Sequence, residues 1–377
     1  MNIAEKRITW RDFIKNIIIR PSPIISTLCN SIFRLEPYTN CMYRCVYCYA
    51  RAPSMNEKIT IKSNYPMLFK RLVKILKKSF IDHLPAFRLS TLSDPFQPIE
   101  RKYKLSLALM KIANKYDVPL IINTKSILPL EEPWLSVIKE LASKRKAIVQ
   151  YTIVVLDDSE AKIIEPLAPP PSEQLKAIDE LNKLGIPTIV RFQPLIPYVN
   201  TSASYMENAV KIFASHGVKQ IISEFVRIRY DELQHFAEIL RKRGDNPDKI
   251  TKDDLWEEIP ETIQKRPNVK FRKSTFEALS KTATEHGLAF ATCRECFFEL
   301  RTAETCCGIH NLTGVLWRKT AYEIFRNING ERKGILYFDR NYVEQFRIRR
   351  LRELITEHFE TLYSILENKE LLFKICP

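Results

Sequence analysis

Three cysteines form the first group of residues that could do chemistry. Cys41, Cys45 and Cys48 have the spacing C-x3-C-x2-C and directly follow a predicted strand at 32–38. Thiolates on one short loop can converge on one metal centre. A structural zinc site takes four ligands, whereas three cysteines suit a [4Fe–4S] cluster with one iron left open. That iron could chelate the amino and carboxylate groups of S-adenosylmethionine (SAM), and an electron from the cluster would then cleave SAM to a 5′-deoxyadenosyl radical.

A second group of cysteines lies nearer the end of the chain. Its members are Cys293, Cys296, Cys306 and Cys307. Four thiols suffice for a second [4Fe–4S] cluster or a structural zinc. Neighbouring side chains diverge, so we expect only one of Cys306 and Cys307 to bind, with His310 or Cys376 completing the set. Two alternatives stay open, namely buried structural thiols and a role for Cys293 as a hydrogen-atom donor.

The composition is that of a folded globular protein with an excess of positive charge. The chain has 377 residues, 45% of them hydrophobic, and a formal charge of +15. This balance excludes wholesale disorder, and only 8 glycines exclude collagen-like or linker-rich chains. The charge favours an anionic partner such as nucleic acid, although a lysine-rich surface gives the same sum.

The sequence also predicts a compartment. No apolar run reaches the roughly 18 residues that span a bilayer, and the first residues, MNIAEKRITWRDF, lack the apolar core of a secretory signal. We therefore expect a cytoplasmic protein with no membrane partner. Thiols stay reduced there, so disulfides are not expected and metal binding is favoured for the clustered cysteines.

An alternation of strands and helices must position these candidate ligands. Apolar β-rich runs alternate with amphipathic helical patterns, which predicts parallel βαβ units. The predicted strands are 32–38, 87–93, 119–126, 147–155, 188–197 and 220–228, and the predicted helices are 64–79, 101–116, 133–143, 172–184 and 203–216. Periodicity alone does not choose between an open doubly wound sheet and a complete or partial barrel.

The rest of the chain departs from this rhythm, and we expect five parts. They are an N-terminal extension (1–30), the core (31–228), a charged surface insertion (229–272), a last helix and strand with the second cysteine group (273–316), and a basic helical C-terminal region (317–377). The last predicted strand ends at Cys293, which would place this thiol on the rim that carries the first group.

The core resembles a known family. With Tyr47, the first group reads C-x3-C-x-aromatic-C, which looks like the signature of the radical SAM superfamily. Six stretches in order resemble the group related to spore photoproduct lyase: 36–41, 48–51, 93–100, 123–126, 165–169 and 193–197. The resemblance covers roughly residues 33–228, about half of the chain. It implies an α/β fold, a partial or complete (β/α) barrel of radical SAM type with the cluster at the carboxyl ends of the strands. To this barrel the sequence adds the helical, cysteine-containing C-terminal extension.

The resemblance also implies which residues bind SAM. Tyr47 would lie next to the adenine, and Ser93 and Asp94 would accept from the amino group. Lys125 would pair with the carboxylate, and Thr152 would supply a hydroxyl. Other roles stay open, because Ser-Asp-Pro is a turn sequence and a lysine or threonine is ordinary at a strand end.

Two polar residues interrupt the otherwise apolar strand at 188–197. Arg191 and Gln193 stand where a buried strand should be apolar. They either point into the barrel mouth or mark exposed positions, and the sequence favours neither.

The sequence departs from spore photoproduct lyase at one position. That enzyme has a hydrogen-donating cysteine just before its Ser-Asp pair, whereas residues 88–94 contain none. We therefore expect a radical SAM enzyme that abstracts hydrogen from a nucleic acid, in repair or modification, without the same thymine-dimer reaction. Its electron donor would be a ferredoxin or flavodoxin. The alternatives are a radical SAM enzyme that modifies a peptide or small metabolite, and a zinc-stabilised nucleic-acid-binding protein without catalysis.

Overall fold

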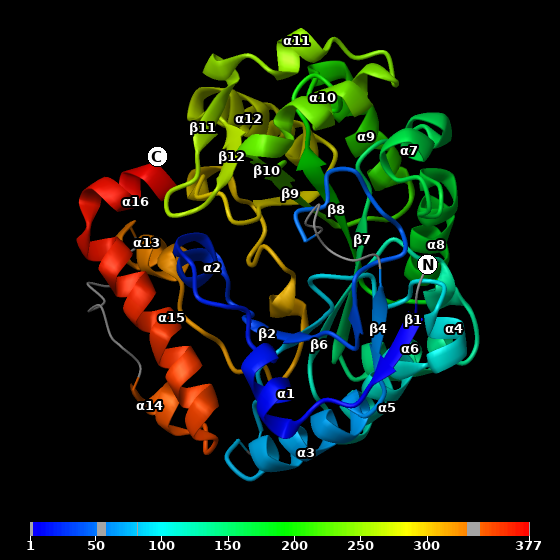
Figure 1. Cartoon of the computed structure of the whole chain (residues 1–377), viewed down its shortest axis with the longest axis vertical. Helices are drawn as coiled ribbons and strands as arrows, with labels where there is room; N and C mark the ends of the chain where they lie inside the picture. The colour runs from blue at the N-terminus through cyan, green and yellow to red at the C-terminus, as the bar shows by residue number, and fades with distance from the viewer. Residues whose placement is uncertain (1–2, 51–57, 81, 330–339, 377) are drawn as a thin grey trace.

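One parallel sheet organises the molecule, a computed structural model that describes residues 3–50, 58–80, 82–329 and 340–376. Its seven strands follow one another in space as in the sequence. They are β2 (Phe33–Leu35), β5 (Phe87–Leu89), β6 (Leu120–Thr124), β7 (Ala147–Thr152), β8 (Thr188–Leu195), β9 (Gln220–Phe225) and β13 (Ala289–Thr292). Within the described residues β2 and β13 do not pair, so the sheet is a partial barrel (Figure 1). The predicted fold class is confirmed.

Helices cover the outer face of the sheet (Figure 1). They are α3 (Tyr65–Lys77), α5 (Leu105–Tyr116), α6 (Trp134–Ser143), α8 (Pro171–Lys183), α9 (Ala203–Ser215) and α12 (Val269–Glu285). Two short helices, α4 (Glu100–Tyr103) and α7 (Asp158–Ile164), follow β5 and β7 and pack outside the core that these helices cover. In α8, Pro171 suits the first turn, Leu175 and Ile178 are buried, and Gly185 follows the end at a φ of +73°. The predicted helices are thus present, and α7 was not expected.

The inner face of the sheet changes character along the strands. Side chains alternate between the two faces of a strand, so every second residue points into the barrel. Ile121, Ile148, Ile189 and Ile222 form an apolar layer there with residues of the segment 303–315. Two residues further along each of these strands stand Asn123, Gln150, Arg191 and Glu224. One end of the barrel is therefore closed by packing, and the other is lined by polar groups.

The N-terminal part adds a small sheet and two helices. The sheet has the order β1-β4-β3, with β1 (Ile3–Lys6), β4 (Ile59–Lys62) and β3 (Tyr38–Thr39). The helices are α1 (Trp10–Asn16) and α2 (Pro23–Leu28). The single strand expected at 32–38 is thus divided between two sheets, because Pro37 lacks the N–H that would continue the ladder.

The segment 229–272 is not only a surface insertion. It contains α10 (Leu233–Arg241) and α11 (Pro247–Ile250), and its strands β11 (Trp256–Glu258) and β12 (Gln264–Pro267) form a sheet with β10 (Ile228–Arg229). Phe236, Leu240, Ile250 and Trp256 belong to a second core that the segment shares with residues after the barrel strands, such as Val155, and even Arg266 is buried. These apolar positions were not recognised in the sequence because charged residues stand between them.

The C-terminal region is helical, as expected. Its helices are α13 (Ala321–Asn329), α14 (Arg340–Glu344), α15 (Arg349–Glu367) and α16 (Lys369–Ile375). Helix α15 lies beside α2 (Figure 1), where the buried His358 ring contacts Ser26 Oγ at 2.8 Å and the Ile19 carbonyl oxygen at 2.7 Å. The part of the chain that the structure describes holds no helix with the length and apolarity to cross a bilayer.

Candidate functional site

A cavity of about 370 Å³ opens at the carboxyl ends of the barrel strands. Ser90, Lys125, Thr152 and Cys293, which line it, stand at or directly after the ends of β5, β6, β7 and β13. The other residues predicted for the first site line the same cavity, namely Cys41, Cys45, Tyr47, Cys48, Ser93 and Asp94. The fold thus brings together side chains that lie up to 252 positions apart in the sequence.

The loop that carries the first three cysteines is fixed by backbone contacts on both sides. Met42 N–H donates to Gln97 Oε1 at 2.9 Å, and Val46 N–H donates to the Ile164 carbonyl oxygen at 2.9 Å. As whole residues Cys41, Cys45 and Cys48 are partly exposed, although the Cys41 thiol itself is buried. Burial raises the pKa of Cys41 to about 12, so this thiol is protonated until a cation replaces its proton.

The donor chemistry of this loop fits a three-thiolate cluster. None of Cys41, Cys45 and Cys48 forms a disulfide in the described part of the chain, and all three line one open cavity. Across the described ranges, no three Cys, His, Asp or Glu side chains are arranged to hold a metal ion. Binding would therefore require the three sulfur atoms to draw together on their loop.

Lys125 and Tyr47 meet at a carboxylate that the sequence analysis gave no role. Lys125 Nζ lies 2.7 Å from Glu165 Oε1 and donates to the Thr152 carbonyl oxygen at 2.6 Å. The Tyr47 hydroxyl donates to the same Glu165 carboxylate. All of these groups are buried or nearly so, and the charges of Lys125 and Glu165 offset each other. Glu165 therefore holds both side chains at the edge of the cavity.

Asp94 has its hydrogen bonds within the chain. Its carboxylate accepts from Phe96 N–H at 2.8 Å, Lys125 N–H at 2.7 Å and Thr124 Oγ1 at 2.9 Å. Burial raises its pKa to about 6 against the opposing effect of these donors. The Ser93 hydroxyl donates to the Tyr38 carbonyl oxygen at 3.4 Å. The Ser-Asp pair thus forms the predicted turn and also lines the cavity.

The two polar residues of β8 point into the barrel. Arg191 and Gln193 both line the cavity, which decides between the two positions that the sequence left open. Gln193 Oε1 and Asn123 Oδ1 are buried and have no hydrogen-bond partner among the described residues. Buried acceptors normally have partners, so these two oxygens suit a ligand that brings N–H groups, as the ammonium and adenine of SAM would.

A cluster of charged residues on the cavity was missed at the level of sequence. Arg88, Arg227, Arg294 and Glu224 all line it. Glu224 could have been found from the sequence, because it is a charged residue within the apolar strand QIISEF, just as Arg191 is a charged residue within the apolar strand β8. Arg227 and Arg294 follow strand ends, where a charged residue is ordinary, and carried no such signal.

The second cysteine group is brought together only in part. Cys293 lines the cavity and also contacts Cys306, which contacts Cys307, and all three lie in the apolar layer of the barrel. Cys296 forms a disulfide with Cys376, 80 positions away. The expectation that the chain has no disulfide was therefore wrong, because α16 folds back onto the loop after β13. His310 contacts Thr305 Oγ1 at 2.8 Å.

Known proteins resemble part of this chain in sequence. No family model matches the chain. An uncharacterised protein of Acidianus two-tailed virus is 28% identical over 193 residues, 51% of this chain and 58% of that protein. A protein of Pseudomonas phage M6 named radical SAM Nα-GlyT isomerase is 25% identical over 262 residues, 69% of this chain and 53% of that protein. The matched region thus spans little more than half of each relative.

Solved structures show the same fold. A variant of spore photoproduct lyase with a dinucleoside spore photoproduct has a TM-score of 0.57 at 14% identity, over 77% of this chain and 82% of that one. The similarity to the spore photoproduct lyase group inferred from the motifs is confirmed, and the named relatives support the prediction of an enzyme.

Proposed function

We propose that this chain, which has the fold of the radical SAM enzymes related to spore photoproduct lyase, cleaves SAM reductively and abstracts hydrogen from a substrate in the same cavity. One observation carries the proposal. The thiols of Cys41, Cys45 and Cys48 line an open cavity at the carboxyl ends of a partial barrel, together with Tyr47 and polar strand-end groups. Catalytic groups of such barrels gather at this end.

The residues of the chain divide the work of binding. Cys41, Cys45 and Cys48 would hold the cluster, which supplies the electron that converts SAM to a 5′-deoxyadenosyl radical. Tyr47 would flank the adenine, with its hydroxyl fixed by Glu165. Asp94, held at the end of β6, would face the amino group of SAM with Ser93.

Lys125 and Thr152 would stand on the carboxylate side of SAM. Because the charge of Lys125 is already offset by Glu165, Lys125 would bind the SAM carboxylate mainly through a hydrogen bond from its ammonium group. The backbone oxygen of Thr152 anchors Lys125, which leaves the threonine hydroxyl available to the ligand.

Cys293 suits the substrate side of the cavity. Cys293 forms no disulfide with a described residue. Cys296, three residues later, is bonded to Cys376 and so cannot serve as a metal ligand beside it. A thiol in this place can donate a hydrogen atom to a substrate radical. Cys293 contacts Cys306, which contacts Cys307, so a second cluster or zinc would find three thiols together but would lack Cys296. We therefore propose a hydrogen-donor role for Cys293.

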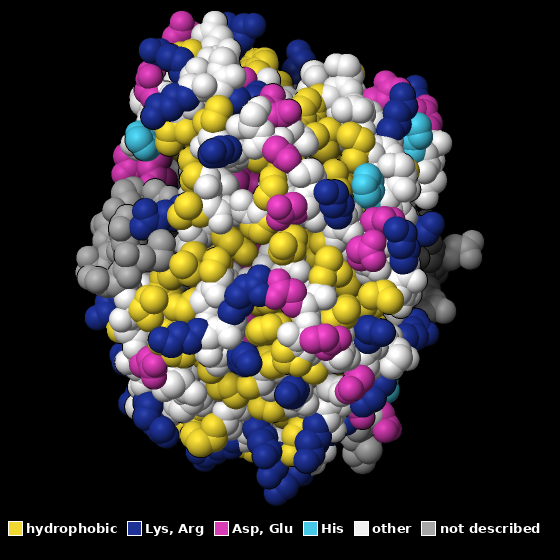
Figure 2. Space-filling model, turned by 90° about the vertical axis from the view of Figure 1, so that its right-hand side faces the viewer, with side chains coloured by type: hydrophobic (Ala, Val, Ile, Leu, Met, Phe, Trp, Pro, Cys, Tyr) yellow, Lys and Arg dark blue, Asp and Glu magenta, His cyan; other side chains and the backbone are white. Residues whose placement is uncertain are grey.

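Nucleic acid is the proposed substrate, with a ferredoxin or flavodoxin as reductant in the cytoplasm. The chain carries a formal charge of +15, and the spore photoproduct lyase structure holds a dinucleoside. On the face in Figure 2, Lys and Arg side chains are spread widely and gather at the lower edge, not in one central track. The charge would therefore attract a polyanion broadly, and a target base would enter the cavity unpaired.

The test is anaerobic reconstitution of the full chain with iron and sulfide, followed by dithionite and SAM. We expect about four irons per chain for one cluster, a brown chromophore, and 5′-deoxyadenosine whose formation is stimulated by single-stranded DNA or RNA. Stoichiometric zinc without iron would contradict the proposal. Stimulation by peptides instead of nucleic acid would contradict only its substrate.

A further inference from the structure

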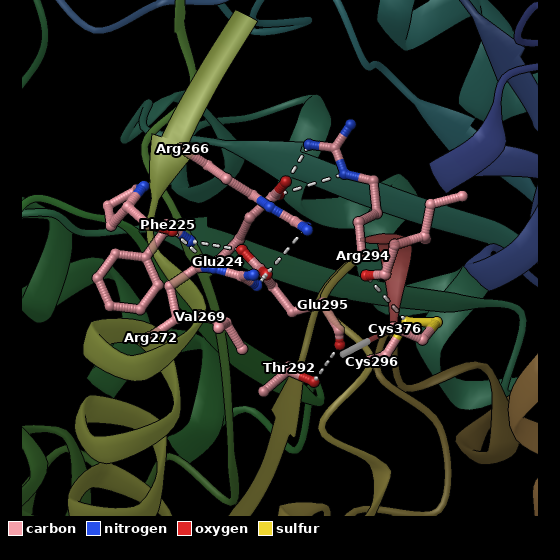
Figure 3. A network of polar contacts seen from close by, with 12 residues as sticks. Glu224, Phe225, Arg266, Val269, Arg272, Thr292, Arg294, Glu295, Cys296 and Cys376 are labelled. Atoms are coloured by element: carbon pink, nitrogen blue, oxygen red, sulfur yellow. Dashed lines mark hydrogen bonds and ion pairs between the residues drawn. A yellow bond between two sulfur atoms is a disulfide. The ribbon is translucent and has the colours of Figure 1, made fainter. Parts of the chain in front are cut away.

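Four arginines surround the substrate side of the cavity. Arg88, Arg191, Arg227 and Arg294 line it, and Glu224 is the carboxylate that faces them. Arg294 donates to Glu224 Oε2 from Nη2 at 2.7 Å and from Nε at 3.2 Å (Figure 3). Arg227 forms an ion pair with the other oxygen of the same carboxylate. One negative charge is thus shared by two guanidinium groups.

The hydrogen-bond partners of the other two arginines are neutral, although, against the effect of burial, the charge of Cys307 raises the pKa of Arg88. Arg191 donates to Gln150 Oε1 at 3.0 Å, and Arg88 donates to the Ser31 carbonyl oxygen at 3.2 Å. Neither makes an ion pair with any described residue. Unpaired buried charge is unfavourable in a protein interior. Burial lowers the pKa of Arg191, and it lowers that of Arg227 to about 9 with a further contribution from Arg294. An anion in the cavity would relieve this excess of positive charge.

The backbone at Arg294 is held in an unfavourable conformation that aims its side chain at the cavity. Its φ is 58°, in the left-handed region that residues with a Cβ rarely adopt. Figure 3 shows that the next residue, Glu295, turns the other way to the guanidinium groups of Arg272 and Arg266. The Cys296–Cys376 disulfide follows directly. Such conformations persist where the surroundings over-determine them, which is typical of ligand sites.

We propose that Arg191 and Arg294 bind an oxyanion of the substrate, a phosphate or a carboxylate, beside Cys293. The inference deepens the proposed function, on which it rests for the identity of the substrate. Guanidinium groups match oxyanions through paired N–H donors. Cys293 directly precedes Arg294 and lies near Arg191, so the anion would place the neighbouring carbon of the substrate at the thiol.

The experiment measures the melting temperature of the full chain against inorganic phosphate and, separately, acetate, with ionic strength held constant by sodium chloride. Wild type, Arg191→Gln and Arg294→Gln are compared. The matched control is Arg349→Gln, which removes the same charge from a side chain that is 88% exposed on α15. We expect a saturable rise for wild type and the control, and at least about tenfold weaker binding in both cavity variants. The anion that binds more tightly identifies phosphate or carboxylate.

Two results would overturn the inference. One is an equal response of all four proteins to both anions. The other is an equal loss of SAM affinity and phosphate affinity in Arg191→Gln, because the site would then serve the carboxylate of SAM. Arg191→Gln should fold, since it removes a cation that lacks a carboxylate partner, and Arg294→Lys provides a second variant that keeps the charge. The measurement does not depend on 5′-deoxyadenosine, so a failed radical reaction and a missing anion site are distinguishable.

Discussion

The two cysteine groups both contain closely spaced thiols, but the fold places them in different environments. Cys41, Cys45 and Cys48 lie on a loop at the open end of the barrel and line its cavity. In the second group, Cys306 and Cys307 are packed against the apolar layer at the closed end, and Cys296 is bonded to Cys376. The difference between the groups is therefore one of access, because the first group lies beside open space and Cys306 and Cys307 of the second do not.

Cysteine substitutions with the largest expected effect test this difference directly. Cys48→Ser should abolish the cluster and reduce 5′-deoxyadenosine to background, because a cluster with an open iron needs all three thiolates. Cys306→Ser should retain the iron and the activity. Iron content and product are measured after the same reconstitution. Loss of iron in Cys306→Ser would instead make the second group a metal site.

The disulfide should contribute the next largest effect. Cys296–Cys376 closes a loop with a sequence separation of 80 residues. The chain-entropy relation gives about 4.5 kcal/mol for such a loop, as an upper value. Cys376→Ser should therefore lower the free energy of unfolding in urea by up to this amount under oxidising conditions. With dithiothreitol the wild type should become as unstable as the variant, and a difference that survives the reductant would assign the effect to packing.

The packing around Cys306 and Cys307 provides a smaller effect. Gly308 has a φ of +74°, and a Cβ there would lie 2.3 Å from Ile189 Cδ1 and 2.6 Å from Ile148 Cδ1. Gly308→Ala should destabilise the protein by about 1–3 kcal/mol, as overpacking does. Gly185→Ala is the control, because its Cβ would meet no atom within 4 Å at a similar φ. An equal loss of stability in both variants would assign the effect to backbone strain at a positive φ and would contradict tight packing at the closed end of the barrel.

The smallest effect concerns ionisation. A hydrogen bond with Cys306, and then the charge of Arg88, lower the pKa of Cys307 to about 7, against 9.0 for an ordinary thiol. The folded state therefore releases this proton at lower pH than the unfolded state, and stability from Cys307 is gained as pH rises from 7 to 9 and lost as it falls through 7. The slope is at most about 1.4 kcal/mol per pH unit.

The measurement is the free energy of unfolding of wild type and Cys307→Ser between pH 7 and pH 9, and the difference between the two proteins gives the contribution of Cys307. The stability advantage of wild type should grow with pH. Parallel curves would show that Cys307 stays protonated like Cys41, whose pKa burial raises to about 12.

Most strands and helices of the core could be predicted from the sequence, because the patterns that specify them are local. Each strand and helix of the core carries its own apolar period, and α8 shows even its start at Pro171 and its end before Gly185. The failures have a different cause. Phe236 and Trp256 lie within a charged stretch and are buried against distant residues such as Val155 and Ile196, so neighbours that lie far apart in sequence decide their burial.

The three-thiol loop and the parallel strands follow from the sequence alone, because eight consecutive residues and short periods are enough to specify them. The pairing of Glu165 with Lys125, of Glu224 with Arg294 and of Cys296 with Cys376 depends on the folded chain. These partners lie 40 to 80 positions apart. Closing such loops costs entropy that only the packing of the whole chain repays, so no local pattern records the pairing.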